Sequence, residues 1–246
     1  MIAGARSSDP SSGPLRNSAQ EAPATVGVIF ATVAGSIDGY GLTRVGHYVS
    51  HMSGTTSLTA QALAQSNGHI IALTMSAAVA FVSGAGLKGA LSDLGRSVTR
   101  VSAFRLLTVE ALLIASALVW SLVAGSSATG TLGLMVLLPF AMGLQNALAA
   151  RFVRHHPRTT HVTETLTSLG YHLGRLARGP VQNEDRTKVL RSALLFSGFL
   201  SGGVGTRLAY NWIGDGVLAA PAATAGALSL LTLSCKLGLA PTSTAE

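Results

Sequence analysis

An acidic side chain lies inside an otherwise uncharged, apolar run near the beginning of the sequence. Asp38 is the one charged residue between positions 22 and 43, and Gly35, Gly39 and Gly41 surround it. A carboxylate at membrane depth costs roughly 2.5–3.5 kcal/mol on insertion scales, so it usually faces a cavity or a partner. Two interpretations stay open: Asp38 binds a solute or couples an ion, or the apolar run ends there and Asp38 caps another segment. The glycines allow either an unwound helix or close helix packing.

Hydroxyl side chains form two clusters further along the chain. The clusters are Ser53, Thr55 and Thr56 in the first half and Thr163, Thr165 and Thr167 in the second. Hydroxyl groups can replace the water around a polar solute, and they also bond to carbonyl groups of their own helix. We expect a substrate-binding site made of Asp38, Ser53, Thr55, Asn146 and Thr163.

Two histidines and a second acidic residue are the candidates for proton-linked chemistry. His51 and His161 begin matching segments, and histidine changes charge near physiological pH. Glu110 lies in a long apolar run, five residues after Arg105. Arginine can extend toward the membrane surface more easily than glutamate can. Glu110 is therefore expected either to form an ion pair or interhelical hydrogen bond, or to relay protons.

A metal site is not predicted, although two histidines are favourably spaced. His47 and His51 are four residues apart, which would place them on one face of a helix, near Asp38 in sequence. No further histidine or cysteine is suitably placed to complete a coordination sphere. No cofactor is expected either.

Composition indicates that lipid surrounds these residues. The chain of 246 residues is 48% hydrophobic and 11% charged, with a mean hydropathy of +0.46. Soluble domains carry roughly 25% charged residues, so this chain has too few to cover a water-soluble surface. The net charge of +7 comes from basic residues between apolar runs, not from one soluble basic face. Nucleic acid is therefore not an expected partner, whereas membrane lipid is.

Six segments are long and apolar enough to span a membrane, which takes roughly 20 residues each. They cover about 25–42, 69–90, 103–124, 129–150, 189–209 and 217–238. The long connections 43–68 and 151–188 also show helical periodicity. In the first, Leu58, Ala62 and Leu63 share a face, and in the second Leu166, Leu169, Leu173 and Leu176 do so. Each connection is expected to hold an interfacial or re-entrant helix.

The distribution of basic residues predicts the orientation. With six spans, all but two of the 17 lysines and arginines lie on the side that holds both termini; the exceptions are Arg44 and Arg207. Because positive charge accumulates on the cytoplasmic side, both termini are expected in the cytoplasm. The expected location is the bacterial plasma (inner) membrane.

The two halves of the chain contain matching segments. Residues 35–39 match residues 143–147 at an offset of 108, and residues 51–55 match residues 161–165 at an offset of 110. Residues 81–84 match residues 199–202 at an offset of 118. Three matches in the same order predict a duplication. Since each half holds an odd number of spans, the halves should be inverted, as in many secondary transporters.

These matching segments resemble the YoaK family of bacterial membrane proteins of unassigned function. The family's Gly-x-x-Asp and His-Met-Thr-Gly-Asn-Thr-like segments correspond to residues 35–38 and 51–56, and its Gly-Leu-Gln-Asn and Thr-x-x-Thr-Gly-x-Leu segments to 143–146 and 160–166. Thr55 stands where the family usually has Asn, and Glu164 where it usually has Gly. The resemblance implies a membrane fold without an established chemistry.

The sequence thus predicts an all-α polytopic membrane protein with six transmembrane helices in two inverted three-helix repeats. Residues 1–24 form a cytoplasmic tail, 25–124 the first repeat, 125–240 the second repeat and 241–246 a short tail. The favoured function is a transporter or permease for a small solute, with a site at the midplane between the repeats. A non-transporting scaffold or sensor is the alternative, ahead of a membrane-embedded enzyme, and no catalytic residue is predicted. Homo-oligomerisation is left open.

Overall fold

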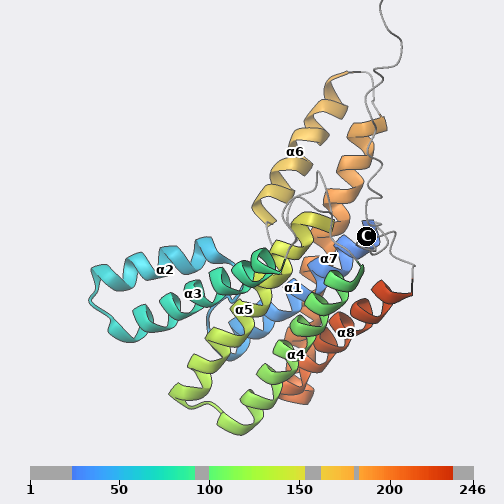
Figure 1. Ribbon diagram of the computed structural model, residues 1–246. Helices are drawn as coiled ribbons and strands as arrows, with labels where there is room; N and C mark the ends of the chain where they lie inside the picture. The colour runs from blue at the N-terminus through green and yellow to red at the C-terminus, as the bar shows by residue number, and fades with distance from the viewer. Residues whose placement is uncertain (1–23, 92–99, 153–161, 180–182, 235–246) are drawn as a thin grey trace, which may run out of the picture.

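The protein is built from helices throughout the part that the structure describes. The computed structural model describes residues 24–91, 100–152, 162–179 and 183–234 (Figure 1). In chain order the elements are α1 (Ala24–Arg44), α2 (Met52–Ala64), α3 (Gly68–Ala90), α4 (Arg100–Ala124), α5 (Ala128–Phe152), α6 (Val162–Arg178), α7 (Asn183–Ile213), the short 3₁₀ helix η1 (Gly214–Leu218) and α8 (Ala219–Leu233). The two connections with helical periodicity thus contain α2 and α6, as the sequence predicted.

Five stretches of the described chain are long and apolar enough to cross a membrane. They are α1, α3, α4, Ala128–Ala150 within α5, and the segment Asn183–Leu233. This last segment contains α7, η1 and α8, for which the sequence predicted two spans. The chain is therefore an all-α polytopic membrane protein, with its last two predicted spans joined by a bend. Gly214, with φ of +53°, provides the left-handed conformation at that bend.

Two helix pairs approach each other so closely that only glycine fits at the contact. A Cβ atom at Gly35 of α1 would lie 1.9 Å from the carbonyl oxygen of Phe199 in α7. A Cβ atom at Gly143 of α5 would lie 2.0 Å from the carbonyl oxygen of Phe81 in α3. Helix α1 runs unbroken from Ala24 to Arg44, so its glycines serve close packing and do not unwind the helix.

The reverse contacts of these pairs follow the same pattern. A Cβ atom at Gly202 of α7 would lie 2.2 Å from the carbonyl oxygen of Thr32, and one at Gly84 of α3 would lie 2.0 Å from that of Phe140. The extensive helix contacts are α1 with α7, α3 with α5, α4 with α8, α4 with α5, α6 with α7, and α2 with α3. Exchanging α1–α4 for α5–α8 in order leaves all of these pairs except α4 with α5 unchanged, because its counterpart, α8 with α1, is a much smaller contact.

The interior is apolar and is centred on α1, α5 and α4. Fully buried side chains of α5, among them Leu134, Leu138 and Met142, pack against Ile37 of α1 and Ile114 of α4 in one cluster. A second cluster joins the other ends of the same three helices. The hairpins α2–α3 and α6–α7 extend from this centre in different directions (Figure 1).

Helix α6 packs on α7 through polar side chains. Thr165 and His172 are its buried residues, whereas Leu166 and Leu173 are 42% and 48% exposed. The Nδ1 atom of His172 lies 2.7 Å from Oδ1 of Asp185, and Nε of Arg175 lies 3.3 Å from its Oδ2. Of the leucine face that the sequence indicated, Leu166 and Leu173 are exposed, whereas Leu169 and Leu176 are partly buried beside the packing face.

Candidate solute-binding site

The segment between α1 and α2 folds back against the middle of α1. Asp38 accepts hydrogen bonds at Oδ1 from the backbone N–H groups of Val49 (3.0 Å) and Ser50 (2.8 Å), and at Oδ2 from the Ser50 hydroxyl (2.6 Å). Gly46, with φ of +77°, allows the turn that reverses the chain. Asp38 is only 3% exposed. Its buried carboxyl group therefore holds the residues just before α2 beside the turn of α1 that contains Asp38.

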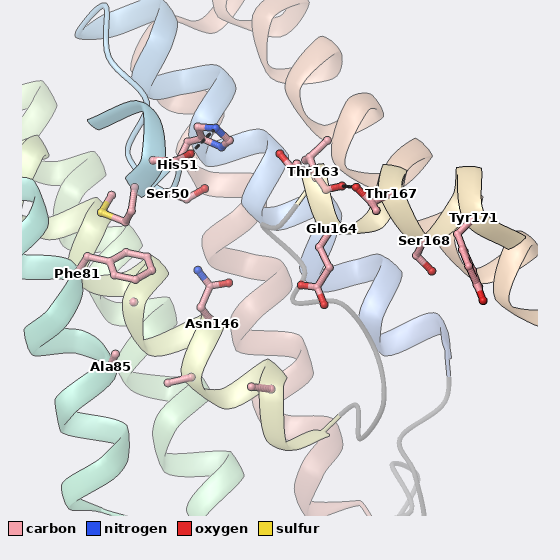
Figure 2. A pocket seen from close by; sticks show the side chains of 16 residues that line it. Ser50, His51, Phe81, Ala85, Asn146, Thr163, Glu164, Thr167, Ser168 and Tyr171 are labelled. Atoms are coloured by element: carbon pink, nitrogen blue, oxygen red, sulfur yellow. Dashed lines mark hydrogen bonds between the residues drawn. The ribbon is translucent and has the colours of Figure 1, made fainter. Parts of the chain in front are cut away.

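A cavity of about 1110 Å³ opens beside this segment. It is bounded by the start of α2, by α3 and α5, and by the first part of α6 (Figure 2). Its hydrogen-bonding side chains are Ser50, His51, Ser53, Asn146, Thr163, Glu164, Thr167, Ser168 and Tyr171. Its apolar wall includes Phe81, Ala85 and Ala147. The cavity can thus hold a small molecule that has both polar and apolar parts.

Two helices begin at this cavity, and an acidic residue accompanies each beginning. The N-terminus of a helix carries a partial positive charge of about half a unit. Asp38 accepts the backbone N–H groups that immediately precede α2, and Glu164 lies in the first turn of α6. Figure 2 shows Glu164 extending from α6 into the space that Asn146 enters from α5. Glu164 thus offsets the partial positive charge at the start of α6, and Asp38 holds the segment that leads into α2.

Half of the eight predicted site residues meet at this cavity. Ser53, Asn146, Thr163 and His51 all line it. The His51 Nε2 atom lies 3.2 Å from the Ser53 hydroxyl oxygen. Asp38 does not line the cavity itself, but it holds Ser50, which does. Asp38 thus caps the segment before α2, as one interpretation held, although α1 continues past it to Arg44. Its role in binding a solute or coupling an ion stays a prediction.

Three predicted residues do not join this group. Thr55 is buried, and its hydroxyl donates to the His51 carbonyl at 3.3 Å, within the first turn of α2. Glu110 lies in α4 and is not part of the cavity lining. His161 lies outside the described residues.

The expected ion pair or hydrogen bond of Glu110 is not found among the described residues. Glu110 is fully buried, and neither carboxyl oxygen has a hydrogen-bond partner within the described part of the chain. Arg105 is exposed on the other side of α4 and does not pair with it. The separation follows from geometry, because five residues along a helix correspond to about 500°, which turns the two side chains roughly 140° apart.

The histidine pair is also arranged differently from the expectation. Residues 45–51 form no helix, so His47 and His51 do not share a helix face. Among the described residues, no group of three or more His, Cys, Asp or Glu side chains could hold a metal ion. Burial, together with the nearby His69, lowers the pKa of His47. This histidine is therefore held in its neutral form in the connection between α1 and α2.

Sequence reasoning did not assign most of the lining to the site, and Ser50, Phe81, Ser168 and Tyr171 are among the residues that it missed. Ser50 could have been found, because the offset of 110 pairs it with Thr160, another hydroxyl residue. Phe81 belonged to a matched segment but carried no chemical signal. Ser168 and Tyr171 face the cavity only because α6 packs through its polar face.

Comparison with known protein families identifies the family of this chain. A model of the family described as "Protein of unknown function (DUF1275)" matches residues 26–231. The chain belongs to the DUF1275 family. The family match covers all the membrane helices and both sides of the cavity, and it brings no activity with it. No curated protein and no solved structure matches the chain. The resemblance to YoaK stays a prediction from the motifs.

Proposed function

We propose that this protein is a transporter for a small polar solute in the bacterial plasma membrane, with the cavity as its solute site. The observation that carries the proposal is the convergence of hydrogen-bonding groups from both halves of the chain on one cavity between apolar helices. Ligand pockets typically have volumes of about 300–1000 Å³ and combine apolar walls with a few polar groups. The cavity, at about 1110 Å³, matches that description.

The two halves act as inverted repeats in this proposal. The support is that five of the six extensive helix pairs map onto one another when the halves are exchanged, together with the matched segments at offsets of 108, 110 and 118 residues. In six spans, the positive charge places both termini in the cytoplasm. Transport then proceeds by rocking of the two halves about a site at their interface, as in other inverted-repeat transporters.

The lining residues have distinct roles. Ser53, Thr163 and Asn146 exchange hydrogen bonds with the solute, and Asp38 acts through Ser50 by fixing its position. His51 can respond to protons at the edge of the site. The proposal needs no catalytic residue and no cofactor, because moving a solute requires only binding and a change of access.

A binding screen followed by uptake tests the proposal. The purified protein is screened by thermal shift against amino acids, sugars, polyols, amines and carboxylates, and each stabilising solute is then assayed for uptake into proteoliposomes. Ser53→Ala and Thr163→Val remove hydroxyls from exposed side chains of the cavity, whereas Ser57→Ala removes one from an exposed residue of α2 outside it. Loss of one hydrogen bond corresponds to roughly tenfold weaker binding.

The expected result is uptake of one class of solute, weakened by Ser53→Ala and Thr163→Val and unaffected by Ser57→Ala. Failure of every solute to stabilise the protein or to enter proteoliposomes would overturn the proposal. Equal effects of all three substitutions would show that the solute binds elsewhere.

A non-transporting scaffold or sensor is the second candidate, favoured by the outward face of α6. Leu166, Leu173 and Tyr171 are 42%, 48% and 60% exposed on the α6–α7 hairpin. An apolar face of this kind suits a protein partner or a second copy of the chain. Copurification of a stable partner that Leu173→Glu releases, with no uptake of any solute, would favour this function.

A further inference from the structure

A second hollow lies between α1 and α7, and Asp38 lies between it and the solute site. This groove has a volume of about 360 Å³, and Asp38 is part of its lining. Ser50, which donates a 2.6 Å hydrogen bond to Asp38, lines the large cavity instead. The Asp38–Ser50 pair therefore separates the two hollows.

The groove and the cavity are lined by equivalent positions of the two halves. The groove residues of α1 and their counterparts in the cavity, at an offset of 108, are Gly35 and Gly143, Asp38 and Asn146, Gly39 and Ala147, and Leu42 and Ala150. The groove residues of α7 and their counterparts in α3, at an offset of 118, are Phe199 and Phe81, and Gly203 and Ala85. Half of the groove lining thus has its repeat counterpart in the cavity lining.

The difference in size between the hollows has an identifiable origin. The helix pairs that form them are equally close, since a Cβ atom would meet the facing carbonyl oxygen at 1.9 Å at Gly35 and at 2.0 Å at Gly143. The cavity is also lined by the beginnings of α2 and α6, which do not line the groove. Tyr48, in the connection that leads to α2, lines the groove, whereas Ser50 in the same connection lines the cavity. This connection therefore belongs to the walls of both hollows, so a movement of it would affect both.

We infer that the groove is the second solute site on the transport pathway, the repeat-related counterpart of the cavity, and that it opens as the cavity closes. This inference rests on the proposed function. In inverted-repeat transporters, the two halves exchange conformations between the two access states. The solute then passes from one hollow to the other beside Asp38.

The two walls together define the class of solute. A volume of about 360 Å³ holds roughly a dozen water-sized groups, so the solute has about that number of non-hydrogen atoms or fewer. Asp38 lines the groove and Glu164 lines the cavity, and a carboxyl group can accept hydrogen bonds at both oxygens. The other ionisable side chains are His51 and Tyr171 in the cavity and Tyr48 and Arg207 in the groove, and Arg207 donates to Asn211 at 2.6 Å. The solute is therefore a small hydrogen-bond donor, such as an amine or a polyol.

Distance measurements between paired spin labels test the coupled opening. In a Cys235→Ser background, one protein carries labels at Leu42 and Val204 across the groove, and a second carries them at Ser53 and Thr163 across the cavity; all four positions are exposed. Both are measured in proteoliposomes between pH 5.5 and 8, with and without the amines and polyols of the screen. We expect conditions that lengthen the groove distance to shorten the cavity distance. If the distance between the labels across the groove stays the same under all conditions, the inference is overturned.

Filling the groove gives a second test. Gly203→Leu places a side chain in the groove, where the first added carbon would be 3.4 Å from its nearest neighbour; Gly205→Leu is the control on the same helix, with nothing within 4 Å. Gly203→Leu should reduce uptake at least tenfold while solute binding in the cavity persists, and Gly205→Leu should change neither. Undiminished uptake by the Gly203→Leu protein would refute the groove's role as a second solute site and would leave the proposed function intact. If no solute binds the unmodified protein, the proposed function itself fails.

Discussion

Replacing Gly35 by alanine tests the contact that joins α1 to α7. The added Cβ atom would lie 1.9 Å from the Phe199 carbonyl oxygen and 2.7 Å from its carbonyl carbon. A usual carbon–oxygen contact is about 3.3 Å or longer, so the shortfall is about 1.4 Å. The obstacle is backbone within a helix and cannot rotate away, so the two helices must separate.

The expected cost follows from two opposing contributions. Overpacking of this kind costs typically 1–3 kcal/mol, and a backbone clash belongs at the upper end, about 3 kcal/mol. Alanine is a better helix former than glycine by about 1 kcal/mol, which offsets part of that cost. Gly35→Ala should therefore destabilise the protein by about 2 kcal/mol. Gly86→Ala, where nothing lies within 4 Å, should instead stabilise it by up to about 1 kcal/mol.

Thermal unfolding in detergent, followed by circular dichroism, measures this difference. For a chain of this size, about 2 kcal/mol corresponds to a fall of roughly 4–8 °C in the unfolding midpoint. Gly143→Ala, whose Cβ would lie 2.0 Å from the Phe81 carbonyl oxygen, should produce a similar fall. Equal midpoints for the Gly35→Ala and Gly86→Ala proteins would refute the reasoning, because the close helix contact at Gly35 would then make no difference to stability.

Three further predictions concern charged and titratable groups. Arg44→Gln should lower stability by about 2 kcal/mol, because Arg44 (10% exposed) and Asp215 (14% exposed) form a 3.1 Å ion pair; a double-mutant cycle with Asp215→Asn that shows no coupling would contradict this. Glu110→Gln should leave the unfolding midpoint unchanged or raise it, because the buried carboxyl group has no hydrogen-bond partner in the described structure to lose; a fall of several degrees would reveal an interaction that the structure lacks. Burial lowers the pKa of His47 below 6.5, so as pH falls the unfolded chain takes up the proton before the folded chain does, and stability should decline below about pH 6.5. His47→Gln should make this decline shallower when unfolding midpoints are measured from pH 8 to 5. An unchanged slope would argue against this prediction.

The membrane helices were predictable because their signal is local. Apolar runs of about 20 residues identify spans without knowledge of their partners. The observed ends of the helices differ from the ends of the predicted spans where charged residues extend a helix beyond its apolar part. Helix α7 begins at Asn183, not near residue 189, because Lys188 pairs with Glu184 at 2.7 Å and Asp185 is held by α6. Hydropathy records only the apolar part of such a helix.

The site was less predictable because its contacts depend on tertiary structure. The sequence marked Asp38 and both hydroxyl clusters, and the matched segments indicated that they belong together. It gave no sign that the connection would fold back and bring Ser50 to Asp38, a contact that depends on the turn at Gly46. The orientation of α6 was equally hidden, since periodicity shows which residues share a face but not which face packs.

The pairing of α1 with α7 also constrains how the protein is made. Helix α1 leaves the ribosome early, yet its glycine face has no partner until α7 begins about 140 residues later. At roughly 5–20 residues per second, this delay is about 7–28 seconds. The wait of α3 for α5 is much shorter, because α5 begins 38 residues after α3 ends, so α1 is the helix that stays longest without its partner. Biogenesis must therefore hold the early helices in or near the insertion machinery, and a chain truncated before α7 should be recognised as incomplete and degraded.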